Sequence, residues 1–84
     1  MSFDPYHKWF GISPNEQPPN YYRLLGIPLF ESDPDIIEAA AASRALYLKT
    51  LNLGEHAAIA TEILNEVALA RVTLITPSKR DEYN

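Results

Sequence analysis

Residues 32–51 read SDPDIIEAAAASRALYLKTL, and this stretch predicts one long helix. Asp33 is a good N-cap, and Pro34 suits the first turn because the N–H that it lacks would have no partner there. The alanine run 39–42 keeps helix propensity high. We therefore predict a helix over about residues 34–51. A 3.6-residue period predicts its core-facing side chains: Ile36, Ala40, Tyr47 and Leu51.

A second long helix is predicted over about residues 56–75, after the helix breaker Gly54. Apolar residues recur there at spacings of three and four, the pattern of a helix that faces a core: Ile59, Ile63, Val67, Ala70 and Leu74. Pro77 ends the pattern, and Thr76 can cap a new short helix. Because only a few residues join the two long helices, we predict an antiparallel helical hairpin.

The first third of the chain contains two similar short segments, Lys8–Ile12 and Arg23–Ile27. Each ends in Gly followed by Ile, which is typical of a short helix that stops at a glycine in the C′ position. We predict short helices near residues 5–10 and 20–25, joined by a proline-rich loop. Together with the hairpin, these short helices place the chain in the all-α class.

The composition is that of one small globular domain. Of the 84 residues, 46% are apolar and 21% are charged, which is too apolar for intrinsic disorder. The net charge of -4 is opposite to that of most nucleic-acid-binding proteins, and no apolar run approaches the ~20 residues that span a bilayer. The chain has no cysteine and no recognisable signal peptide. We therefore predict a cytoplasmic protein, monomeric in isolation, that binds neither nucleic acid nor membrane.

Chemically reactive residues are few and scattered. The two histidines, His7 and His56, lie in different predicted elements, and His7 with Asp4 is at most half of a metal site. Glu62 and Glu66 share one helix face, as paired catalytic carboxylates would, but a solvated face explains them as well. No serine has a nearby histidine to activate it. We therefore predict no enzymatic activity, no metal site and no cofactor.

Both ends of the region 20–84 resemble a J-domain, the helical module of DnaJ-type co-chaperones. Residues 20–27, NYYRLLGI, resemble the family's opening helix, Asp-Tyr-Tyr-x-x-Leu-Gly-Val. Residues 74–84, LITPSKRDEYN, resemble its closing helix, Leu-Ser-Asp-Pro-x-Lys-Arg-x-x-Tyr-Asp. The resemblance implies a J-domain-like hairpin with short flanking helices, on which residues 1–19 pack as an N-terminal extension. Residues 3–12 are similar to a segment that precedes J-like regions in large bacterial proteins, notably planctomycete ones.

The family's functional tripeptide is missing from this chain. J-domains carry His-Pro-Asp directly after a tyrosine that aligns with Tyr47, whereas this chain has Leu48, Lys49 and Thr50 there. The resemblance implies that the tripeptide triggers ATP hydrolysis in a DnaK-type chaperone. It also implies a basic outer face on the second helix, and the corresponding positions here are not basic: Ile37, Glu38, Ala41, Ala42 and Leu46. A chain that lacks both features is not expected to stimulate such an ATPase.

The helix predicted over residues 34–51 has a wider apolar arc than one neighbouring helix needs, because Ile37, Ala41 and Leu48 extend it. In one interpretation Trp9, Phe10 and Ile12 fold back across this arc, so that the N-terminal segment is part of the core, with Trp9 as an anchor. In the other, Ile37, Ala41, Leu48 and Trp9 form an exposed surface for a partner.

These features predict a non-catalytic module for protein-protein interaction or domain docking. Its partner would be another protein or another domain of a longer parent chain, since the abrupt end at Tyr83-Asn84 suggests a domain taken from a longer polypeptide. The alternative is a molecular co-chaperone that engages a DnaK-type chaperone through a non-standard surface.

Overall fold

The computed structural model describes residues 3–51 and 54–84, and every regular element in these residues is helical. In chain order the elements are α1 (Pro5–Phe10), the 3-10 turn η1 (Pro14–Glu16), α2 (Tyr21–Leu25), α3 (Pro34–Thr50), α4 (Ala57–Ile75) and α5 (Pro77–Tyr83). The predicted all-α class is confirmed, and the predicted helix boundaries are correct to within one residue. The predicted loop between the long helices includes residues 52–53, which lie outside the described residues.

Local sequence signals set the helix ends. The Asp33 carboxylate accepts a hydrogen bond from the backbone N–H of Asp35 at 2.9 Å, so it caps α3 as predicted. Gly11 and Gly26 end α1 and α2 with left-handed φ angles of 69° and 74°, which a side chain would oppose. Pro77 opens α5 directly after α4, so the chain turns there without a loop.

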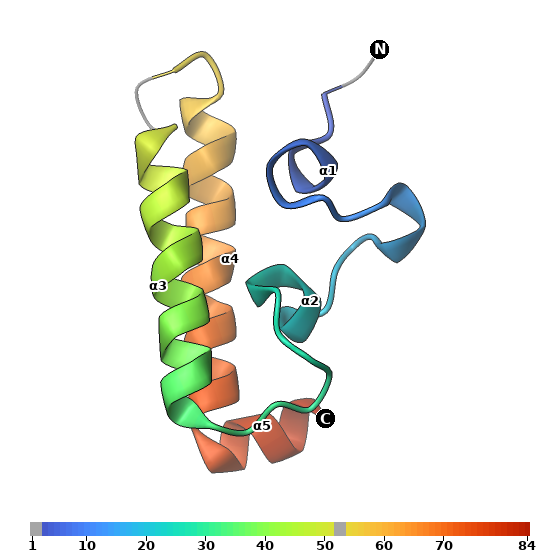
Figure 1. Cartoon of the computed structure of the whole chain (residues 1–84), viewed down its shortest axis with the longest axis vertical. Coiled ribbons are helices and arrows are strands. Elements are labelled where there is room, and N and C mark those ends of the chain that lie inside the picture. Colours follow the sequence, from blue (N-terminus) through green and yellow to red (C-terminus); the bar gives the residue numbers. More distant parts are fainter. Residues whose placement is uncertain (1–2, 52–53) are drawn as a thin grey trace.

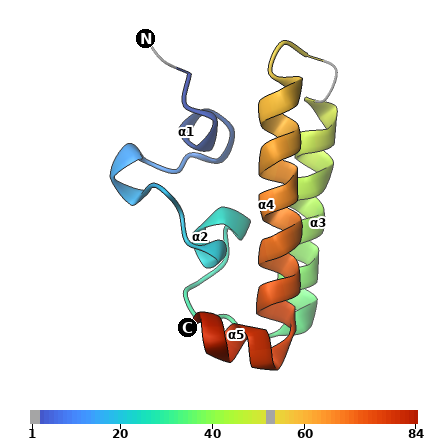
Figure 2. The same cartoon turned by 180° about the vertical axis from the view of Figure 1, so that it is seen from behind.

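The two long helices, α3 and α4, lie side by side and antiparallel along the long axis of the molecule (Figure 1). Helices α1 and α2 lie along one side of this pair, and α5 runs across the end at which α4 finishes (Figure 1 and Figure 2). The core lies between α2, α3 and α4, and its buried side chains are Tyr22, Leu24, Leu25, Ile37, Ala41, Leu48, Ile63, Val67, Ala70 and Leu74. Helix α1 adds partly buried side chains at the edge of this core.

The apolar stripe predicted for α4 is confirmed. Its members from Ile63 to Leu74 are buried, and Ile59 is partly buried against them. This stripe faces α2 and α3, which explains why α4 contacts both of these helices. Among the described residues no helix, α4 included, combines the length and the apolar character needed to cross a membrane.

The core-facing side of α3 is shifted by one residue from the prediction. Ile37 and Leu48 are fully buried, whereas Ile36 and Tyr47 are 44% and 41% exposed. The prediction was wrong for these two residues, while Ala40 and Leu51 are partly buried against the core. The reason is that α3 carries two adjacent apolar stripes about 100° apart, and a 3.6-residue period fits both of them. Tertiary contacts choose between the stripes: Arg44 lies on the inward side, where its Nε donates to a backbone carbonyl of α2 at 3.1 Å.

Helices α2 and α5 bring the two ends of the region 20–84 together. The Tyr22 hydroxyl donates a hydrogen bond to Asn84 Oδ1 at 2.8 Å, and the Tyr83 hydroxyl accepts one from the Tyr21 backbone N–H at 2.9 Å. The rings of Tyr21 and Tyr83 also stack, with centroids 4.6 Å apart. These contacts hold α5 across the end of the hairpin, although the bonded residues are 62 positions apart in the chain.

The observed face of α3 can be tested with two adjacent residues. Ile37→Ala is expected to lower the free energy of unfolding by about 2–5 kcal/mol, because it empties a buried site. Ile36→Ala is expected to change it by less than about 1 kcal/mol, because Ile36 is exposed. Urea unfolding followed by circular dichroism measures both. Equal losses, or a larger loss at Ile36, would contradict the observed face.

A second pair of variants tests the contact between α2 and α3. Gly11→Ala and Gly26→Ala both place a side chain at a positive φ, which costs about 1–2 kcal/mol. At Gly26 the new Cβ would also lie 2.6 Å from Arg44 Nη2, whereas nothing lies within 4 Å at Gly11. We expect Gly26→Ala to reduce stability to urea by about 1 kcal/mol more than Gly11→Ala, because Arg44 must give up its hydrogen bond. Adding Arg44→Met to both variants should remove this difference, and a difference that persists would have another cause.

Candidate functional site

Leu48, Lys49 and Thr50, which align with the J-domain tripeptide, form the last turn of α3. Leu48 is buried in the core, and Lys49 and Thr50 are exposed. The Thr50 hydroxyl donates a hydrogen bond to the backbone carbonyl of Tyr47 at 2.6 Å, and the C-cap of the helix is Leu51. This position is therefore a helical turn whose first residue belongs to the core.

The interpretation of Ile37, Ala41 and Leu48 as an exposed patch is wrong. All three have at most 2% of their surface exposed, because they face α2 and α4. A partner could reach them only if the hairpin opened. Trp9, the fourth residue of the predicted surface, is partly buried at the edge of the same core.

Phe10 attaches the N-terminal segment to α3. The centre of its ring lies 4.4 Å from the Arg44 guanidinium carbon and 6.1 Å from the centre of the Tyr47 ring. Burial lowers the pKa of Arg44, with a smaller contribution from the nearby Arg23, but the guanidinium stays charged. The N-terminal segment thus folds back over the hairpin: Phe10 packs on Arg44, which lies on the same side of α3 as Leu48, and Ile12 is fully buried.

Trp9 and Phe3 attach the N-terminal segment to the beginning of α4. The Trp9 ring makes edge contacts with the rings of Phe3 and His56, at centroid distances of 5.4 and 6.4 Å. Phe3 and His56 stack on each other at 3.9 Å. Trp9 is therefore an anchor between the N-terminal extension and the hairpin, with part of its surface still open to solvent.

A hydrogen bond links α1 to the middle of α4. The Tyr6 hydroxyl lies 2.7 and 2.9 Å from the two carboxylate oxygens of Glu66 and donates to this carboxylate. Burial and this hydrogen bond raise the pKa of Tyr6 to about 12, and the charges of Glu66 and Glu62 act in the same direction. Glu66, which the sequence offered as half of a carboxylate pair, thus holds α1 in place.

This bond predicts a pH dependence at high pH. Because the pKa of Tyr6 is raised from 10.0 to about 12, folding favours its neutral form, and this stabilisation is present below pH 10 and lost as the pH rises through about 12. An ultraviolet titration of tyrosinate should show a late-ionising component from Tyr6, absent in Tyr6→Phe and in the urea-unfolded chain. A Tyr6→Phe variant that keeps the late component would contradict this assignment.

Asp4 is engaged as a helix cap and as a partner of Gln17. Its carboxylate accepts hydrogen bonds from the Gln17 side-chain amide at 3.0 and 3.1 Å and from the His7 backbone N–H at 3.2 Å. These bonds, that to Gln17 above all, lower the pKa of Asp4. The half-site considered for His7 and Asp4 is therefore a capping contact made by the backbone. Among the residues that the structure describes, no group of three or more His, Asp or Glu side chains could hold a metal ion.

A shallow hollow of about 380 Å³ lies between α3 and α4. Alanine side chains form much of its wall: Ala41, Ala42, Ala45 and Ala68. Glu38 and Arg71 also line it and form an ion pair, with an Nη2 to Oε2 distance of 2.8 Å. The pairing lowers the pKa of Glu38 and raises that of Arg71. Glu38 and Arg71 thus neutralise each other, and Lys49, which also lines this hollow, adds one positive charge.

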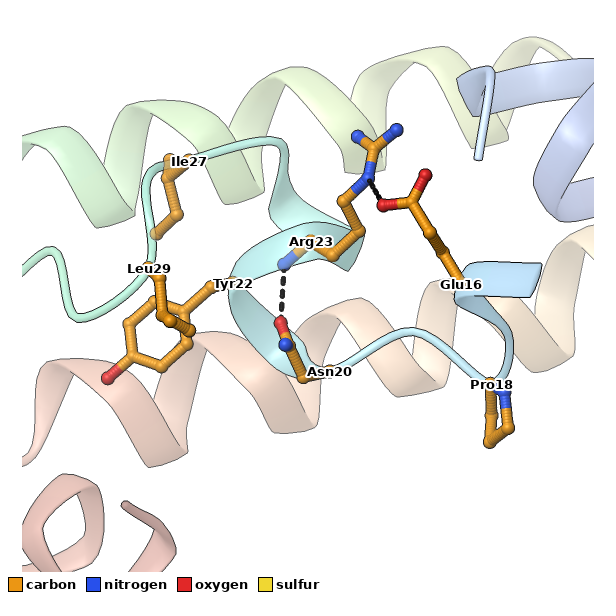
Figure 3. A pocket seen from close by; sticks show the side chains of 7 residues that line it. All are labelled: Glu16, Pro18, Asn20, Tyr22, Arg23, Ile27 and Leu29. Atoms are coloured by element: carbon orange, nitrogen blue, oxygen red, sulfur yellow. Dashed lines mark hydrogen bonds and ion pairs between the residues drawn. The ribbon is translucent and has the colours of Figure 1, made fainter. Parts of the chain in front are cut away.

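A second hollow, of about 410 Å³, lies beside α2 and was not anticipated from the sequence (Figure 3). We call it the α2 hollow; its lining residues are Glu16, Pro18, Asn20, Tyr22, Arg23, Ile27 and Leu29. Tyr22, Ile27 and Leu29 gather at one end, and Glu16 and Arg23 lie at the other (Figure 3). Arg23 Nε lies 2.9 Å from Glu16 Oε2, so the hollow has an apolar end and a charge-balanced end.

Next to the α2 hollow, the chain projects two large apolar side chains into solvent. Leu29 and Phe30 are 60% and 61% exposed. They occupy the middle of a turn closed by a hydrogen bond from the Glu31 N–H to the Pro28 carbonyl at 3.1 Å. The sequence signal that could have indicated this surface is the pair of large apolar residues after Pro28, in a segment with no helical period.

No protein-family model, curated protein or solved structure matches this chain, so its function is inferred from its own residues.

Proposed function

We propose that this chain is a non-catalytic module for protein-protein interaction or domain docking, related to the J-domain but unable to stimulate a DnaK-type ATPase. The packing of its motifs supports this proposal. The segment that resembles the family's opening helix forms α2, and the segment that resembles the closing helix includes α5. Tyr21 and Tyr22 of the first segment contact Tyr83 and Asn84 of the second, so the two motifs belong to one packed unit.

The observation that carries the proposal is the burial of Leu48, the first of the three residues at the position where a J-domain has its tripeptide. A triggering motif must be presented to the chaperone, whereas Leu48 is part of the core and Thr50 bonds back to its own helix. Presenting this turn would require the removal of Leu48 from the core, at a cost of about 2–5 kcal/mol. A domain of this size has few kcal/mol of stability to lose.

The charge of α3 supports the same conclusion. The helix contains two cations, Arg44 and Lys49, and two acids, Asp35 and Glu38, so it is neutral overall. Arg44 turns inward toward α2. Lys49 is therefore the one cation of α3 that is exposed, and a single exposed lysine provides little attraction for an acidic chaperone surface.

We further propose that the module has no enzymatic activity of its own. Two of the carboxylates that could act as acids or bases have structural partners: Glu66 accepts from Tyr6, and Asp4 accepts from Gln17. Glu16 is paired with Arg23 at the α2 hollow. These pairings favour a role in binding over a role in acid-base chemistry.

Single-turnover ATP hydrolysis by a DnaK-type chaperone tests the proposal. An excess of the chain is expected to leave hydrolysis at its basal rate, while a J-domain that carries His-Pro-Asp, added as a control, accelerates it. Acceleration by the chain itself would overturn the proposal and favour a co-chaperone that acts through a non-standard surface. Lys49→Glu would then show whether the exposed cation of α3 takes part.

A further inference from the structure

We propose that the turn bearing Leu29 and Phe30, together with the adjoining α2 hollow, docks an apolar segment of a partner protein that is flanked by Lys or Arg residues. This inference rests on the proposed docking function and gives it a surface and a class of partner. Residues 28–31 are called the Phe30 turn below.

The backbone at Phe30 is unfavourable for the residue that it carries. Phe30 has a φ of 65°, and it is the one non-glycine residue with a positive φ in the described part of the chain. It occupies the third position of the turn closed between Pro28 and Glu31, where a positive φ favours Gly or Asn. A bulky side chain in this conformation is a genuine outlier. Such outliers concentrate at functional sites, where the surrounding structure maintains them.

The Phe30 side chain does little to stabilise the fold. Its ring meets Tyr22 edge-on at a centroid distance of 5.8 Å, and 61% of the residue remains exposed. Leu29 beside it is 60% exposed. Neighbouring apolar side chains that project from a turn are the kind of surface that anchors protein interfaces, because a partner that covers them removes their area from water.

The α2 hollow continues this apolar surface. Leu29 belongs to the Phe30 turn and also lines the hollow, and Tyr22 and Ile27 form the rest of the hollow's apolar end (Figure 3). A partner that covers Phe30 can therefore place an apolar side chain of its own in the hollow. The combination of a projecting aromatic residue and an adjacent hollow favours a side chain-into-pocket contact.

The local charge identifies the kind of partner. The stretch from Pro28 to Asp35 contains three acidic residues, Glu31, Asp33 and Asp35, and no Lys or Arg. The cation nearest in the hollow, Arg23, is already paired with Glu16. Two copies of this chain would bring like charges together, and an anionic membrane or a nucleic acid would be repelled. A protein segment with apolar residues between Lys or Arg residues is complementary both to the apolar surface of Leu29 and Phe30 and to the acidic residues beside it.

Two synthetic peptides test the partner chemistry. One carries leucines and a phenylalanine flanked by lysines, and its matched control has glutamates in place of the lysines. Amide chemical shifts of the chain should move saturably for residues around the α2 hollow and the Phe30 turn with the lysine peptide, and its affinity should fall as salt rises. The glutamate peptide should bind at least about tenfold more weakly. Absence of saturable binding, equal affinities, or shifts centred on the hollow between α3 and α4 would overturn the inference.

Phe30→Asn separates a binding role from a structural one. Because Asn tolerates a positive φ, the urea midpoint should stay the same or rise, while affinity for the lysine peptide should fall by about tenfold, the effect of losing one anchoring side chain. The matched control is Leu46→Asn, which removes a 69% exposed apolar residue from α3 and should leave binding unchanged. A lower urea midpoint for Phe30→Asn, or equal affinities in both variants, would show that Phe30 is not a docking residue.

This result is independent of the ATPase assay. If the chain binds neither peptide and leaves the chaperone at its basal rate, the docking surface proposed here is overturned and the proposed function stands. If the chain binds the lysine peptide through Phe30 and also accelerates ATP hydrolysis by the chaperone, the docking surface stands and the proposed function is overturned.

Discussion

Burial of Ile37, Ala41 and Leu48 against α2 and α4 is the contact on which the rest of the structure depends. A chain of this size buries only about 60–65% of the surface that it exposes when unfolded, so each apolar stripe contributes a large part of its stability. With this stripe inside, Arg44 lies at the edge of the core, and its guanidinium reaches both a carbonyl of α2 and the ring of Phe10. The orientation of one helix thus positions α2 and the N-terminal segment together.

The N-terminal extension is joined to the hairpin almost entirely through side chains. Tyr6 donates a hydrogen bond to Glu66 near the middle of α4, and Phe10 packs on α3. Trp9 lies at the edge of the core, with its ring against that of His56. A link of this kind combines burial of aromatic area with hydrogen bonds that fix the position of α1. The aromatic side chains of the extension therefore cover the part of the core edge that the short helix α2 does not reach.

Two apolar residues of this chain, Leu48 and Phe30, differ in burial and therefore in what they can stabilise. Leu48 lies where the resemblance to J-domains would place a presented motif, yet it is fully buried and stabilises the hairpin. Phe30 is exposed in a backbone conformation that its side chain opposes. A buried apolar residue stabilises the fold because its surface is removed from water. An apolar residue that is held exposed in an unfavourable backbone conformation gives this stabilisation only when a binding partner covers it. This contrast supports the proposed function, in which the module would bind a partner without activating a chaperone.

The helices and their ends follow from short-range chemistry that is written in consecutive residues. Asp33 and Pro34 start α3, Gly11 and Gly26 end the short helices, and the spacing of the apolar residues from Ile63 to Leu74 indicates the face that α4 buries. The face of α3 was decided only by tertiary packing, because its two apolar stripes satisfy the same period and residues of α1, α2 and α4 select between them. The α2 hollow is lined by residues of one short stretch, Glu16 to Leu29, and Phe30 follows directly, but much of this stretch is loop and turn, whose path no apolar period encodes.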